Sequence, residues 1–78
     1  MEIKVLGTGC AKCNLLEDAT KQAVAKAGID AEVEKVTDMA QIMSYGVMST
    51  PALVVDGEVR IAGRVPSVED LVALLTRG

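Results

Sequence analysis

The spacing of hydrophobic residues in the first half of the chain predicts a strand, a long helix and a second strand. Residues 3–6 form a short apolar segment typical of a β-strand. Hydrophobic side chains then recur at helical spacing, which predicts a helix over about residues 11–27: Leu15, Leu16, Ala19, Ala23, Val24 and Ala27. Gly28 stands where a left-handed glycine would end that helix. Residues 29–36 alternate apolar with polar side chains, the pattern of a half-buried strand.

A short helix is predicted next. Thr37 or Asp38 can cap it, and it is expected to run to about Tyr45 and to end at Gly46. The residues expected to point inward are Met39, Ile42 and Met43. We interpret Met48, like Met43, as a core-filling side chain rather than a metal ligand. Tyr45 is interpreted as packing in the same way.

The last part of the chain predicts a hairpin and a final helix. Residues 52–55 and 58–62 are two short strands, and Asp56-Gly57 between them is a typical hairpin turn. Ser67 can cap the final helix, with Asp70 at its third position. Its apolar face is expected to consist of Val68, Leu71, Val72 and Leu75. The predicted order of elements is therefore β-α-β-α-β-β-α.

Length and composition fit one domain with one modest core. The chain has 78 residues, of which 50% are hydrophobic, and no linker or repeat divides it, so we expect a single domain over residues 1–78. Tyr45 is the only aromatic residue, which requires an aliphatic core. The net charge of −3 and the lack of a basic cluster argue against a nucleic-acid partner. No apolar run approaches membrane-spanning length and no signal peptide is recognised, so we expect a cytoplasmic protein without a membrane partner.

The candidate chemistry lies in the two cysteines, Cys10 and Cys13, which are three residues apart in the sequence. They follow Gly7-Thr8-Gly9, where the first predicted strand gives way to the long helix. The amino terminus of a helix carries unpaired N–H groups and a partial positive charge, which stabilise a thiolate. The second cysteine is expected one turn further along, on the same face of the helix. Such a pair in a cytoplasmic strand-helix-strand context is typical of a redox site.

Other interpretations of the cysteine pair stay open at this stage. It could be a structural disulfide, although so short a loop removes little chain entropy. It could bind a soft metal or a metalloid, alone or shared between two chains, or it could consist of two small core residues. A zinc site closed by Cys and His within one molecule is excluded, because the chain has no His and no third Cys.

Two further motifs make the whole chain resemble a known family. Ser49-Thr50-Pro51-Ala52 precedes the predicted hairpin, and Gly63-Arg64-Val65-Pro66-Ser67 follows it. Together with Cys-x-x-Cys and the order of elements, these residues resemble the minimal thioredoxin fold of the small archaeal and bacterial glutaredoxin-sized thioredoxins, or redox-active disulfide proteins. The resemblance implies an α/β fold with a four-stranded mixed sheet flanked by three helices. The implied activity is the reduction or exchange of protein disulfides.

The resemblance also implies a role for individual residues. Cys10 would be the nucleophile and Cys13 the resolving thiol, and their redox-active disulfide would need no other cofactor. In this fold the proline matching Pro51 is cis and faces the cysteines, and the backbone of Thr50 pairs with a bound substrate. The implied substrate surface also includes Gly9, Ala11, Lys12 and Gly63. The implied partners are disulfide-containing proteins and an electron donor of the thioredoxin-reductase type, and we expect a monomer.

The chain departs from the larger thioredoxins at several positions. Gly9 stands where they usually have Trp, Ala11-Lys12 where they have Gly-Pro, and Lys4 where they bury an Asp. Their redox potential therefore cannot be transferred to this chain. Small metallochaperones of the ferredoxin-like type also carry Cys-x-x-Cys after the first strand. Their order is β-α-β-β-α-β and they usually have Met where this chain has Thr8, so metal binding is the alternative function.

Overall fold

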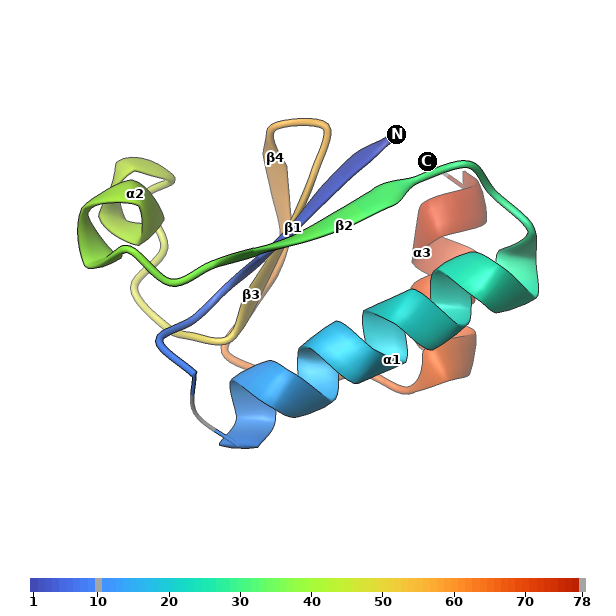
Figure 1. Ribbon diagram of the computed structural model, residues 1–78, viewed down its shortest axis with the longest axis horizontal. Helices are drawn as coiled ribbons and strands as arrows, with labels where there is room; N and C mark the ends of the chain where they lie inside the picture. Colours follow the sequence, from blue (N-terminus) through green and yellow to red (C-terminus); the bar gives the residue numbers. More distant parts are fainter. Residues whose placement is uncertain (10, 78) are drawn as a thin grey trace.

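The sheet has four strands in the order β2-β1-β3-β4 in the computed structural model, which describes residues 1–9 and 11–77. β1 (Glu2–Leu6) lies between β2 (Glu32–Val36), which is parallel to it, and β3 (Ala52–Val55), which is antiparallel. β4 (Glu58–Ala62) pairs with β3 in the antiparallel sense at the other edge. The sheet is therefore mixed, as the family resemblance implied (Figure 1).

Helices cover both faces of this sheet (Figure 1). α1 (Ala11–Ala27) and α3 (Val68–Arg77) pack on one face, and α2 (Met39–Ser44) packs on the other. The order β-α-β-α-β-β-α over the described residues confirms the predicted fold class. None of these helices combines the length and the apolar character that crossing a bilayer requires.

The core consists of two aliphatic layers, one on each face of the sheet. The larger layer lies beneath α1 and α3 and contains Ile3, Val5, Leu16, Ala23, Leu53, Ile61, Leu71 and Leu75. The smaller layer lies beneath α2 and contains Leu6, Val36, Ile42, Ala52 and Val54. Successive side chains of a strand point to opposite faces, so β1 and β3 each contribute to both layers. The cores are aliphatic, as the composition required.

The predicted turn and cap residues lie at the ends of the helices and strands, as expected from the sequence. Gly28 has a φ of +68° and ends α1. Asp56 and Gly57 have φ values of +51° and +83°, the left-handed conformation that a two-residue hairpin turn requires at both positions. The backbone N–H of Asp70 donates to Ser67 Oγ at 3.1 Å, which caps α3. These local interactions set the ends of the elements that carry the site.

Three predictions about the α2 region are wrong. The side chains of Met39 and Met43 were expected inside, but they are 54% and 67% exposed. α2 has only six residues and meets the sheet along one side, so Ile42 is its one buried residue. Met48, interpreted as core packing, is 98% exposed. These three methionine side chains are therefore not part of the hydrophobic core.

β2 begins at Glu32, later than the predicted start at residue 29. The pairing with β1 starts at Glu2 and Glu32, so the preceding residues have no strand beside them. Ile29 and Ala31 still pack against the larger core layer. Alternation of apolar and polar residues indicates which side chains are buried. A β-strand also needs a neighbouring strand to pair with, so the alternation here extends beyond the strand itself.

Candidate active site

Of the two predicted redox residues, Cys13 can be placed, whereas Cys10 lies outside the described residues. Cys13 lies in the first turn of α1 and is fully buried, with 0% of its surface exposed. The chain reaches this turn from β1 through Gly7, Thr8 and Gly9. A substrate cannot contact the Cys13 sulfur while it is buried in this way. The position is therefore suited to a thiol that reacts within the molecule.

Gly7 allows the end of β1 to lie directly against Cys13. A Cβ at Gly7 would collide with the Cys13 sulfur and would stand 2.8 Å from the Cys13 Cβ. The Gly7 N–H donates to the Val36 carbonyl at 3.0 Å, so the backbone cannot easily move away. Close approach of backbone to a side chain is a reason for glycine that does not require an unusual φ. The sequence contained no signal for this contact.

The Thr50-Pro51 peptide bond is cis, as the family resemblance implied. Pro51 is buried and Thr50 is exposed. The N–H of Gly63 donates to the Pro51 carbonyl at 2.8 Å. Gly63 has a φ of +78°, and a Cβ there would stand 3.0 Å from the Cβ of Ser49. Gly63 thus supports the proline segment through its backbone.

Strand register brings several of the predicted site residues to one end of the strands. Leu6 of β1 pairs with Ala52 of β3, and Ala52 pairs with Ala62 of β4. Continuing each pairing by one residue places Gly7, Pro51 and Gly63 in a row, just beyond these strand ends. Gly9, Ala11, Lys12 and Thr50 are among the exposed residues of the neighbouring segments. The fold therefore brings together three segments that are distant in the sequence, and one of them, at Gly7, lies against Cys13.

Lys4 and Tyr45 form a separate contact on the α2 side of the sheet. Lys4 Nζ donates to Tyr45 Oη at 3.3 Å and lies 3.5 Å from Glu2 Oε1. The hydrogen bond to Tyr45 is the main reason that the pKa of Lys4 is raised above its ordinary value of 10.5. Tyr45 is half-buried and packs against the smaller core layer, as predicted.

We expect Tyr45→Phe to lower the pKa of Lys4, and to lower it more than Glu2→Gln does, because the Tyr45 contact raises it most. A raised pKa means that this contact stabilises the folded state below about pH 10.5. The contribution is lost as the pH rises through the folded-state pKa of Lys4. An NMR titration of the Lys4 side chain measures the shift. A larger decrease in Glu2→Gln than in Tyr45→Phe would contradict the assigned cause.

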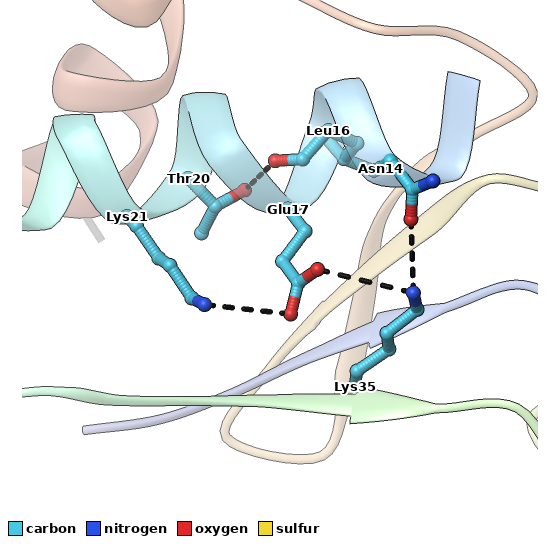
Figure 2. Close-up of polar contacts among 6 residues, drawn as sticks. All are labelled: Asn14, Leu16, Glu17, Thr20, Lys21 and Lys35. Atoms are coloured by element: carbon cyan, nitrogen blue, oxygen red, sulfur yellow. Dashed lines mark hydrogen bonds and ion pairs between the residues drawn. The ribbon is translucent and has the colours of Figure 1, made fainter. Parts of the chain in front are cut away.

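A polar cluster joins β2 to the first two turns of α1 (Figure 2). Lys35 Nζ donates to Asn14 Oδ1 at 2.9 Å and lies 4.0 Å from Glu17 Oε1. The other carboxylate oxygen of Glu17 lies 3.6 Å from Lys21 Nζ. Sequence reasoning missed the contact between Lys35 and Asn14, because the two residues are 21 positions apart and belong to different elements. The cluster begins at the residue that follows Cys13.

The described residues do not assemble a metal centre from hard and borderline ligands. Among residues 1–9 and 11–77, no three or more His, Cys, Asp or Glu side chains are close enough to hold one ion. The alternative of a soft ion bound by two thiolates uses Cys10 and Cys13, the pair that the redox interpretation also uses.

Comparison with known proteins agrees with this geometry. A family model described as the thioredoxin domain matches residues 1–76. A thioredoxin from Methanothermobacter thermautotrophicus is 47% identical over 76 residues, which cover 97% of this chain and 99% of the relative. A thioredoxin from Methanocaldococcus jannaschii is 44% identical over 69 residues, which cover 88% of this chain and 79% of the relative. With a buried cysteine at the start of α1 and a match over nearly its whole length, the chain belongs to the thioredoxin family.

Proposed function

We propose that this protein is a thiol-disulfide oxidoreductase that reduces or exchanges disulfides of other proteins through Cys10 and Cys13. The observation that carries the proposal is the placement of Cys13, which is fully buried in the first turn of α1 and in contact range of Gly7. A buried thiol beside a helix amino terminus is suited to resolving a mixed disulfide rather than to meeting a substrate first. The two curated relatives, both named thioredoxin, support the same chemistry.

In the proposed reaction, the Cys10 thiolate attacks one sulfur of the substrate disulfide. The substrate S–S bond breaks, a mixed disulfide forms and one substrate sulfur leaves as a thiolate that takes up a proton. The Cys13 thiolate then attacks the Cys10 sulfur and releases the second substrate thiol. The substrate has gained two electrons, and the protein holds the Cys10–Cys13 disulfide. A dithiol donor returns the protein to its reduced form by the reverse exchange.

The surface around Pro51 is the proposed substrate platform. Thr50 is exposed beside the buried Pro51, and we propose that its backbone pairs with an extended substrate segment, as the family resemblance implies. Gly9, Ala11, Lys12 and Gly63 are exposed on the adjoining segments and would form the rim of the same surface. We further propose that the protein acts as a monomer in the cytoplasm, with a donor of the thioredoxin-reductase type. The donor follows from the family resemblance, and the location follows from the sequence, in which no signal peptide is recognised.

Insulin reduction tests the proposal. We expect the protein to couple insulin reduction to NADPH oxidation when a thioredoxin reductase is present, and to do so faster than with glutathione and glutathione reductase. The variant that carries Cys10→Ser together with Cys13→Ser is the control, because it lacks both sulfurs, and its circular dichroism spectrum is compared with that of the wild type to check the fold. Turnover in neither reductase system would contradict the proposed function.

The metal-binding alternative predicts a different result for the same preparation. A metal carrier would be purified under reducing conditions with a stoichiometric soft metal ion bound to its two thiolates. Elemental analysis and native mass spectrometry detect such an ion directly. Stoichiometric metal combined with no disulfide turnover would make the carrier the better interpretation.

A further inference from the structure

Two residues at the end of β2, Lys35 and Val36, are connected to the first turn of α1. On one side the Val36 carbonyl accepts the Gly7 N–H at 3.0 Å, and Gly7 lies against the Cys13 sulfur. On the other side Lys35 Nζ donates to Asn14 Oδ1 at 2.9 Å (Figure 2). Asn14 is the next residue after Cys13. Two consecutive residues of β2 therefore fix the position of Cys13, one through backbone and one through a side chain.

Lys35 also brings a positive charge to this turn. Its side chain is 32% exposed and that of Glu17 is 19% exposed, so solvent screens their interaction only in part. Glu17 is four residues after Cys13, and its carboxylate lies between Lys35 at 4.0 Å and Lys21 at 3.6 Å. Lys12, the cationic residue within this turn itself, is exposed. Lys35 is thus the partly buried cation that both compensates Glu17 and contacts the cysteine turn.

We propose that Lys35 is a positioning residue for the redox pair, which ties Asn14 to β2, compensates the Glu17 carboxylate and thereby favours the reduced form. The proposal deepens the proposed function and rests on it. It assigns to Lys35 an effect on Cys10 and Cys13 that is exerted through neighbouring groups and not by contact with a substrate.

The direction of the effect follows from charge. Without the Lys35 ammonium, the Glu17 carboxylate is compensated by Lys21 alone, and Asn14 loses its partner on β2. A less compensated negative charge near the start of α1 disfavours a thiolate and raises the pKa of the reactive thiol. Because thiolate formation stabilises the reduced protein, its loss moves the equilibrium toward the disulfide.

The test compares Lys35→Gln with Lys21→Gln, in equilibrium with a glutathione redox buffer. Each variant removes one positive charge and one ion pair with Glu17, but only Lys35 contacts Asn14. We expect Lys35→Gln to shift the equilibrium about threefold toward the disulfide, the size typical of one charge near a helix terminus. Threefold equals about 14 mV, since a tenfold change corresponds to about 30 mV for two electrons. We expect Lys21→Gln to shift the equilibrium less, because it weakens the compensation of Glu17 but leaves the contact between Lys35 and Asn14 intact.

A second readout and a rescue separate this role from simple stability. The pH profile of alkylation of the reactive thiol is expected to move to higher pH in Lys35→Gln and to return toward the wild-type profile in Lys35→Arg. Lys35→Gln is also expected to have a smaller effect when Asn14→Ala is already present, because the contact between the two side chains is then already lost and only the compensation of Glu17 remains. Equal shifts in Lys35→Gln and Lys21→Gln, or no shift in either, would overturn the proposal for Lys35.

These outcomes are distinct from a failure of the proposed function. A wild-type protein that forms no reversible disulfide in the glutathione buffer would overturn both proposals. A wild-type protein that cycles normally, beside a Lys35→Gln variant with the same equilibrium and the same alkylation profile, would overturn only the role of Lys35.

Discussion

Cys10→Ser is expected to abolish disulfide reduction, whereas Cys13→Ser is expected to trap a covalent adduct with the substrate. The reason is the burial of Cys13, which leaves Cys10 as the thiol that a substrate can meet. Without Cys13, the mixed disulfide on Cys10 has no internal thiol to resolve it. Insulin reduction measures the first effect. Intact-mass spectrometry of the Cys13→Ser protein, incubated with a disulfide substrate, measures the second as an added substrate mass.

Alkylation of the reduced wild-type protein provides the control for this division of labour. Iodoacetamide is expected to label Cys10 before Cys13, because reaction requires an accessible thiolate. Peptide mapping of a partly labelled sample gives the order. Faster labelling of Cys13 would invert the assignment, since it would show that the sulfur buried in this structure is the more accessible one in the reduced protein.

Gly7→Ala is expected to lower the free energy of unfolding by about 1–3 kcal/mol, the usual cost of adding a methyl group to a well-packed site. The new Cβ would collide with the Cys13 sulfur and would stand 2.8 Å from the Cys13 Cβ. Moving Gly7 away would weaken its hydrogen bond to Val36, and moving Cys13 away would disturb the packing around a fully buried side chain. Urea denaturation of the wild-type and variant proteins, each under the same redox condition, measures the difference.

The same substitution in a Cys13→Ala background tests the cause. Removing the sulfur eliminates the worst contact and leaves only the Cβ at 2.8 Å, so part of the cost of Gly7→Ala is expected to disappear. The two substitutions then show a coupling energy, as residues in direct contact do. An identical cost in both backgrounds would mean that Gly7 is required for a reason other than its contact with Cys13.

Much of the fold was predictable because its signals are local. The helical spacing of residues 11–27 matches α1, and Gly28 ends it with a positive φ. Asp56-Gly57 forms the predicted hairpin turn, and Ser67 caps α3. Each of these depends on the conformational preference of one or two residues and their neighbours. The α2 methionines were wrongly assigned, because a period of 3.6 residues says little about burial in a helix of six residues.

The sequence by itself determined the order of the elements, the cysteine pair at the start of a helix and the proline segment that resembles the thioredoxin family. Only the tertiary structure decided that Gly7 lies against Cys13 and that Lys35 reaches Asn14. These contacts exist because β2 pairs with β1 while α1, which connects the two strands, packs on one face of the sheet, and this brings distant positions together. Spacing along the chain reports local conformation, whereas the steric and electrostatic surroundings of a sulfur atom depend on which strands become neighbours.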